Sequence, residues 1–172
     1  MKPKIYVIAA VDKIGGLAKE GGIPWHYPSD MKFFKQITSE TLDPAKHNIV
    51  IMGRKTWETI PDQFRPLPGR ENIVLSSNKN LHLLGATVVD SLEHVLYREY
   101  QTVEKIFIIG GAQLYHTVME LPDIDGVYLT RIQKNYDCDL FFPDIPEHFT
   151  KQIHIRDTEE TGDKLEFWYY GK

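Results

Sequence analysis

The sequence predicts an α/β fold: a central, mostly parallel, twisted sheet of about eight strands with an antiparallel C-terminal edge, flanked by about four helices. Three observations support this prediction. Short apolar runs rich in β-branched residues recur along the chain, and such runs suit strands that are buried on both faces. Helical patterns lie between these runs in the first two thirds of the chain. The last third has strand-like runs with no helices between them.

The parallel part of the sheet is expected from five apolar runs. They cover residues 5–11, 48–52, 73–75, 87–89 and 106–109. The first helix is expected to be capped by Ser29, with Asp30, Phe34 and Ile37 on one face and Met31 beside them. Three more helices are expected to start near Arg54, Ser91 and Ala112, the last with Tyr115 and Met119 on its inner face.

The antiparallel edge is expected from residues 127–132, 153–157 and 165–170. Polar residues 159–163 lie between the last two runs and predict a hairpin turn. Two long segments, residues 12–28 and 61–71, have no regular pattern. Long irregular loops in a compact domain are often functional, so candidate site residues are sought there first.

Composition narrows the class of protein. A length of 172 residues fits a single domain, expected over residues 1–172, and the net charge of −4 argues against a nucleic-acid partner. Cys138 is the only cysteine, which rules out an intrachain disulfide and favours a reducing compartment. No apolar run approaches a membrane span, and Asp12 and Lys13 end the first run too early for a signal peptide. We therefore expect a cytoplasmic monomer with no membrane partner.

Several common catalytic motifs are missing. The chain has no G-x-G-x-x-G fingerprint, phosphate-binding P-loop, nucleophile elbow or H-E-x-x-H motif. Its seven histidines show no metal-ligand spacing, so no metal is expected. Five short segments remain as candidates for a site.

The first candidate segment is residues 23–31, where Asp30 precedes an apolar helical turn. Two interpretations are open. Asp30 could support the helix dipole, or it could share a pocket face with Met31 and Phe34. In the second case apolar walls would raise its pKa and let it bind an amidine-like ring edge. Trp25 is equally compatible with a core position.

Three further segments combine basic or hydroxyl side chains with turns. Residues 52–57 lead from a strand into a helix whose start could bind an anion, although a solvated basic turn is the alternative. Residues 64–70 form a proline-rich turn ending in Arg70, which could grip a carboxylate or simply lie on the surface. Residues 75–77 present hydroxyls at a strand end.

The fifth segment is residues 108–115, in which two glycines separate a buried strand from a helix. Glycine at Gly110 and Gly111 would let a ligand approach the backbone, and the helix start could offer its amides to a phosphate. An ordinary strand-to-helix turn is the alternative. Taken alone, each of the five segments is weak evidence.

In their order and spacing, these segments closely resemble the dihydrofolate reductase family over almost the whole chain, including residues 5–10 and 127–130. The resemblance implies reduction of dihydrofolate to tetrahydrofolate with NADPH, by hydride transfer from nicotinamide C4 to pterin C6. It puts the family's carboxylate at Asp30, supported by Trp25 and by the Thr130 hydroxyl. Arg70 would bind the α-carboxylate of the glutamate tail. The pterin and benzoyl groups would lie among Ile8, Met31, Phe34, Ile60, Leu67 and Ile109.

The resemblance also implies a cofactor site. The Ala10 backbone would hold the nicotinamide carboxamide, and Leu17, Gly21 and Gly22 would belong to a loop that closes over it. Residues implied for the rest of NADPH are Arg54, Lys55, Thr56, Leu75, Ser76, Ser77, Gly110, Gly111, Ala112, Gln113, Leu114 and Tyr115. Arg54, Ser76 and Ser77 would contact its 2′-phosphate. In the family the two glycines are joined by a cis bond, and the Arg65-Pro66 bond would be a second one.

The chain departs from the family pattern in several places. Ala112 stands where glycine or serine is common in the family. Ala18 stands where glycine is common, so the loop at Ala18 could differ in flexibility. Ser77 stands where some members have a basic residue, which leaves Arg54, with help from Lys79, to select NADPH. Residues 41–46 add length that resembles the longer eukaryotic form.

Two other functions stay open at this point. One is a different reductase of the same fold, such as the pyrimidine reductase of riboflavin synthesis, which would lack Arg70 and the pair Trp25 and Asp30. The other is a catalytically silent protein that binds NADPH or folate. The retention of Asp30, Trp25 and Arg70 argues against decay of the site.

Overall fold

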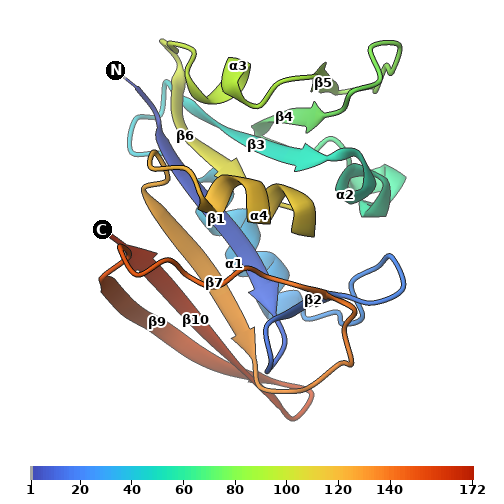
Figure 1. Ribbon diagram of the computed structural model, residues 1–172, viewed down its shortest axis with the longest axis vertical. Helices are drawn as coiled ribbons and strands as arrows, with labels where there is room; N and C mark the ends of the chain where they lie inside the picture. Colours follow the sequence, from blue (N-terminus) through green and yellow to red (C-terminus); the bar gives the residue numbers. More distant parts are fainter. Residues whose placement is uncertain (1) are drawn as a thin grey trace.

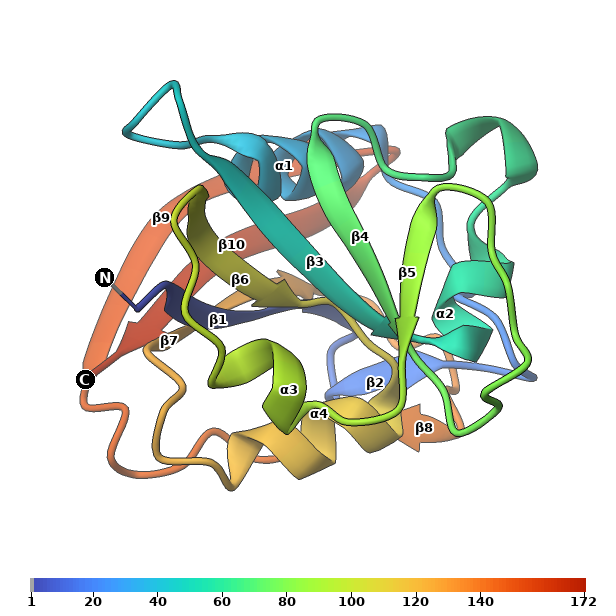
Figure 2. The same cartoon turned by 90° about the horizontal axis from the view of Figure 1, so that it is seen from above.

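The computed structural model describes residues 2–172 and contains one eight-stranded sheet with helices on both faces (Figures 1 and 2). The strands in this sheet are β1 (Lys4–Val11), β3 (His47–Gly53), β4 (Arg70–Leu75), β5 (Ala86–Val89), β6 (Val103–Ile108), β7 (Gly126–Ile132), β9 (Lys151–Glu160) and β10 (Asp163–Gly171). Their order is β5-β4-β3-β6-β1-β7-β10-β9. All pairs are parallel except β7–β10 and β10–β9, so the predicted mostly parallel sheet with an antiparallel C-terminal edge is confirmed.

The helices lie where the sequence pattern predicts them, with two changes at their starts. They are α1 (Pro28–Ser39), α2 (Arg54–Thr59), α3 (Glu93–Leu96) and α4 (Ala112–Met119), with a 3₁₀ turn η1 (Asp62–Phe64). The prediction that Ser29 caps α1 is wrong: Tyr27 is the N-cap, and the Ser29 hydroxyl instead donates to Glu160 Oε2 at 2.9 Å. The third helix begins at Glu93 rather than at Ser91.

Two short strands form without any signal in the sequence pattern. β2 (Gly16–Ala18) pairs with β8 (Leu140–Phe141) in a separate two-stranded sheet. The hairpin between β9 and β10 is tighter than the five polar residues suggest, because both strands continue to a two-residue turn. Thr161 and Gly162 form this turn with φ of 52° and 83°. In two-residue hairpin turns, positive φ at both residues gives the backbone a twist that matches the right-handed twist of the two strands.

The two faces of the sheet are covered by different helices. α1 lies on one face and α3 and α4 lie on the other, as seen from above in Figure 2. The core on the α3 and α4 side includes Ile5, Val7, Leu114 and Val118, all buried. On the α1 side two apolar clusters meet the sheet, one around Phe107 and the other around Phe33, Leu165 and Phe167. None of the helices in residues 2–172 is long and apolar enough to cross a membrane.

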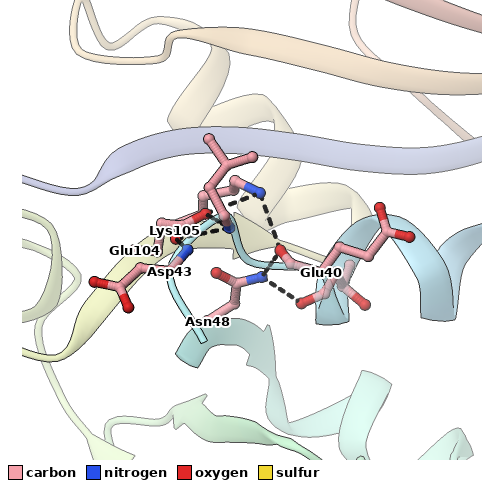
Figure 3. A network of polar contacts seen from close by, with 7 residues as sticks. Glu40, Asp43, Asn48, Glu104 and Lys105 are labelled. Atoms are coloured by element: carbon pink, nitrogen blue, oxygen red, sulfur yellow. Dashed lines mark hydrogen bonds and ion pairs between the residues drawn. The ribbon is translucent and has the colours of Figure 1, made fainter. Parts of the chain in front are cut away.

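A polar network fixes the C-terminal end of α1 to the sheet (Figure 3). The side-chain amide of Asn48 on β3 donates to the carbonyls of Thr38 and Glu40, each at 2.9 Å. Lys105 Nζ on β6 donates to the same Glu40 carbonyl at 3.0 Å. Glu104 accepts from the backbone amides of Leu42 and Asp43 at 2.8–3.0 Å, which anchors the added segment 41–46. Two carbonyls at the end of α1, those of Thr38 and of the C-cap residue Glu40, are thereby satisfied.

Candidate active site

The principal cleft opens at the carboxyl ends of β1, β3 and β6, and its volume is about 1620 Å³. β1 and β6 are neighbours in the sheet, yet the chain leaves β1 towards α1 on one face and leaves β6 towards α4 on the other. Ligand sites in open α/β sheets lie at such points, where the connections separate. The order of the strands therefore creates the cleft.

Almost all of the residues predicted for the site line this cleft. They are Ile8, Ala10, Leu17, Gly21, Gly22, Trp25, Asp30, Met31, Phe34, Arg54, Lys55, Thr56, Ile60, Leu67, Arg70, Leu75, Ile109, Gly110, Gly111, Ala112, Gln113, Leu114, Tyr115 and Thr130. Ser76 and Ser77 do not line it. Ser76 lines a second hollow of about 740 Å³, and Asp90 borders both spaces.

The carboxylate of Asp30 is in the first turn of α1, on the wall of the cleft. Burial raises its pKa to about 6, and the negative charge of Glu160 acts in the same direction. A side-chain hydrogen bond with Thr130 opposes both effects. Apolar walls thus keep Asp30 partly protonated near neutral pH, so this group can hold and exchange a proton.

Trp25 lines the same cleft as Asp30, and Tyr136 supports its ring. Its ring packs against Tyr136 with the centroids 5.2 Å apart. The Tyr136 amide donates to Asp12 Oδ2 at 3.0 Å, and Asp12 Oδ1 also accepts from Gly16 N at 2.7 Å. Asp12 is buried and connects the loop after β1 to the loop after β7. Sequence inspection treated Asp12 only as the residue that ends the first apolar run.

Arg70 provides the positive charge at another part of the cleft. Arg70 is 9% exposed, and desolvation lowers the pKa of its guanidinium. Nε donates to the Pro68 carbonyl at 3.0 Å and Nη1 to the Thr38 hydroxyl at 2.9 Å. A guanidinium has five donors, and among the described residues its Nη2 group has no hydrogen-bond partner. The arrangement leaves donors for an anionic ligand.

The backbone between β6 and α4 approaches its neighbours closely. The Gly110-Gly111 and Arg65-Pro66 bonds are both cis, as the resemblance implies. Gly110 has a φ of +122°, and a Cβ on it would lie 3.3 Å from the Tyr115 hydroxyl. A Cβ on Gly111 would lie 3.4 Å from Thr56 Oγ1. In this strip of backbone the positive φ and the tighter contact favour glycine at Gly110, whereas a Cβ on Gly111 would make an ordinary van der Waals contact.

The first turn of α4 presents its amides next to this strip. Gly111 is the N-cap of α4, and it makes no side-chain cap hydrogen bond. The free amides and the helix dipole together favour a phosphate group. Tyr115 is buried, and its hydroxyl donates to the Ile8 carbonyl at 2.7 Å. This bond fixes α4 against β1.

Arg54 is already engaged by a neighbour that the sequence analysis did not consider. Its Nε donates to Glu58 Oε1 at 2.8 Å, and both side chains are about half exposed. Glu and Arg side chains four residues apart on a helix commonly form an ion pair, so the spacing of Arg54 and Glu58 in the sequence already predicts this contact. Lys32 and Lys35 on α1 also line the cleft, although no motif pointed to them.

One further cluster lies outside the cleft. His154, Asp157 and Glu166 bring three metal-ligand atoms within 4.8 Å of one another on the β9–β10 surface. Sequence inspection found no metal spacing because these residues come together through strand pairing. Lys164 Nζ lies 3.5 Å from Asp157 and 3.9 Å from Glu166, so its single positive charge already offsets part of the negative charge of the two carboxylates.

Comparisons with known proteins identify the family and the fold of this chain. A family model described as dihydrofolate reductase matches residues 4–172. The dihydrofolate reductase of Heliothis virescens is 39% identical over 168 residues, with 94% of this chain and 89% of that protein covered. The dihydrofolate reductase of Drosophila melanogaster is 38% identical, covering 94% and 93%. The structure of Schistosoma mansoni dihydrofolate reductase matches with a TM-score of 0.85 at 35% identity, over 99% of each chain.

A second kind of relative is much longer. The bifunctional dihydrofolate reductase-thymidylate synthase of Daucus carota is 44% identical over 150 residues, which is 82% of this chain and 28% of that protein. The chain therefore spans about 28% of the length of such bifunctional relatives.

Proposed function

Because this chain belongs to the dihydrofolate reductase family, we propose that it is an oxidoreductase that reduces 7,8-dihydrofolate to 5,6,7,8-tetrahydrofolate with NADPH. Its product would supply thymidylate, purine and one-carbon metabolism. The observation that carries the proposal is the pairing, in one cleft, of a carboxylate whose pKa is raised to about 6 with a buried arginine that has free donors. A folate ligand has a polar ring at one end and a carboxylate at the other.

The residues along the cofactor side fit a dinucleotide. Gly110, whose positive φ and 3.3 Å approach to the Tyr115 hydroxyl favour glycine, lies in the wall of the cleft together with Gly111. The first turn of α4 would hold the pyrophosphate through the amides of residues 112–114. When bound, the cofactor supplies the hydride for pterin C6. Arg54 would bind the 2′-phosphate once it releases Glu58, together with Ser76, which lines the second hollow, and Ser77, which follows it in the chain.

The chemistry of the protein's own groups follows from their positions. Asp30 would bind the 2-amino group and N3 of the pterin and assist protonation at N5, with Thr130 as its partner. Trp25, held by Tyr136, would support that region with a bound water. Ile8, Met31, Phe34, Ile60, Leu67 and Ile109 would form the apolar walls around the substrate. Arg70 would take the α-carboxylate, because a guanidinium and a carboxylate form paired hydrogen bonds.

We propose that residues 1–172 work as one domain and as a monomer, since both walls of the cleft come from this chain. Cys138 is buried, and a lone unpaired thiol suits the cytoplasm. Gel filtration and light scattering of the purified chain test the monomer: a mass near 19.9 kDa is expected, and twice that mass would contradict it.

A spectrophotometric assay tests the reaction. Loss of NADPH absorbance should require dihydrofolate, and NADH should be used less efficiently. The pyrimidine substrate of riboflavin synthesis should give no turnover, which separates this function from the other reductase of the same fold. A folded protein that binds dihydrofolate and NADPH without turnover would be a silent binding protein. A folded protein that binds neither would overturn the proposal.

A further inference from the structure

The helix that carries Asp30 has no cap of its own. Tyr27, the N-cap of α1, makes no side-chain cap hydrogen bond, and Pro28 follows it. Glu160, the last residue of β9, supplies the missing acceptor from a distant part of the chain. It accepts from Ser29 Oγ at 2.9 Å, and its two carboxylate oxygens lie 3.3 and 3.4 Å from the Ser29 amide. A carboxylate at a helix start satisfies a free amide and favours the dipole.

A second carboxylate on the same turn holds the residue before the helix. Asp163 begins β10 and is the register partner of Glu160, with the Thr161-Gly162 turn between them. The buried Tyr27 hydroxyl donates to Asp163 Oδ2 at 2.7 Å. The Tyr27 carbonyl in turn accepts the amides of Asp30 and Met31 at 3.0 and 3.1 Å. The β9–β10 turn therefore holds the start of α1 at two residues that precede Asp30. Asp163 binds Tyr27, and Glu160 binds Ser29.

Several ionisable groups face this end of α1. Glu160 and Arg156 come from β9 and Asp163 from β10, and Arg156 lies over the Phe33 and Phe167 rings at 5.6 and 5.2 Å. From the segment after β7, Lys134 Nζ lies 3.9 Å from Asp163 Oδ2, and the Tyr136 hydroxyl is hydrogen-bonded to the Tyr27 hydroxyl. Tyr115 faces Asp30 from α4, and its hydroxyl donates to a backbone carbonyl. Lys32 and Lys35 on α1 are exposed. Among these groups Glu160 is the one whose charge raises the pKa of Asp30.

We propose that Glu160 is a positioning residue for Asp30, which caps α1 through Ser29 and holds a second negative charge near the Asp30 carboxylate. This inference rests on the proposed role of Asp30 in the reaction. It goes beyond that role because it assigns a function to the β9–β10 turn, which does not line the cleft. The capping contact fixes where Asp30 stands. The charge helps Asp30 to retain its proton at higher pH.

Glu160→Gln tests the charge with little change in shape, because the amide oxygen can still accept from Ser29. The pKa of the Asp30 carboxyl, followed by NMR titration, should fall by about half a unit, the size expected for loss of one nearby, partly solvated charge. In single-turnover hydride transfer, the rate below this pKa should not change. Above it the rate should be about threefold lower, since the protonated fraction falls by the factor set by the pKa shift.

Glu159→Gln is the matched control, because it removes the same charge from the neighbouring residue, whereas the hydrogen bonds of Ser29 go to Glu160. It should leave both the titration and the rate profile unchanged. Ser29→Ala keeps the charge and removes the shortest hydrogen bond between Ser29 and Glu160, so it should lower the Tm without the drop in pKa that Glu160→Gln produces. Thermal unfolding of each variant shows that it is folded.

The outcomes separate the two proposals. An inactive wild-type protein whose Asp30 titration still moves in Glu160→Gln would overturn the proposed reaction and support the role of Glu160. An active wild type with superimposable titrations and rate profiles in Glu160→Gln would overturn the role of Glu160. Equal shifts in Glu159→Gln and Glu160→Gln would also overturn it, because they would mean a general effect of surface charge.

Discussion

Arg70 and Thr38 share a buried hydrogen bond that joins the first residue of β4 to α1: Arg70 Nη1 donates to Thr38 Oγ1 at 2.9 Å. Thr38 in turn donates to the Phe34 carbonyl at 2.7 Å. Thr38 is fully buried, so its hydroxyl has a fixed direction. The guanidinium is therefore held in place before any ligand arrives, which lowers the entropy cost of binding a carboxylate.

Arg70→Leu should mainly weaken binding of dihydrofolate. Loss of a hydrogen-bonded charge pair is worth roughly 1.5–3 kcal/mol, or about 10- to 150-fold in Kd. A ligand without the glutamate should bind almost equally well to wild type and variant in fluorescence titrations. Equal losses for both ligands would show that Arg70 supports the fold through Thr38 and Pro68 instead.

Asp30→Asn should slow hydride transfer by about 10²–10⁴-fold at neutral pH, the usual range for acid–base assistance. The wild-type rate should fall as the pH rises through about 6, because the raised pKa of Asp30 marks the loss of its proton. The deficit of the variant should shrink at low pH, where solvent protonates more substrate. NADPH affinity should stay constant. Near-normal single-turnover rates at neutral pH would move the catalytic role to another group.

Arg54 and Glu58 offer a test of cofactor choice. Arg54→Ala should reduce the preference for NADPH over NADH in kcat/KM by about 10-fold or more, as expected for loss of a charged hydrogen bond to a phosphate. Glu58→Gln should raise the preference slightly, because an exposed ion pair that competes for Arg54 is worth roughly 0.2–1 kcal/mol. If both variants keep the wild-type ratio, Arg54 does not read the 2′-phosphate.

Asp12 should contribute to stability more than to catalysis. It accepts hydrogen bonds from the amides of Ile14, Gly16 and Tyr136. Asp12→Ala leaves these donors unpaired, and a loss of about 2–5 kcal/mol in unfolding free energy is expected from urea denaturation. Asp12→Asn retains one acceptor oxygen and should lose less.

The pH dependence of stability gives a second check on Asp12. Burial acts to raise its pKa, but the three backbone hydrogen bonds and the Cys138 thiol outweigh burial and lower it. A carboxyl with a lowered folded-state pKa stabilises the protein above its unfolded-state pKa. This stabilisation is lost as the pH falls through the lowered value. The Tm difference between wild type and Asp12→Asn should therefore narrow on acidification, and a difference independent of pH would contradict this account.

The sequence allowed prediction of features that depend on local pattern. The apolar runs around Val50 and Phe107 became buried strands, and the residues that follow these strands met at one edge of the sheet because parallel strands end together. Contacts between residues that are far apart in the chain leave no local pattern in the sequence, so they could not be predicted. Ser29 has the right chemistry for an N-cap, but it is the second residue of α1, and Glu160, 131 residues away, takes its hydroxyl. β2 and β8 are too short to show a period.

The position of β1 in the sheet affects how the chain can fold during synthesis. β1 lies near the N-terminus, but its neighbours in the sheet are β6 and β7, which come much later in the chain. Lys4, for example, pairs with Lys105. A ribosome-bound chain shorter than about residue 103 would thus have an apolar central strand with two unsatisfied edges, which is the kind of segment that aggregates or recruits chaperones. Synthesis of residues 103–132 then completes both pairings and closes the cleft walls together. The ligand cleft is consequently a late product of folding, and nascent chains should bind folate only after β7 has left the exit tunnel.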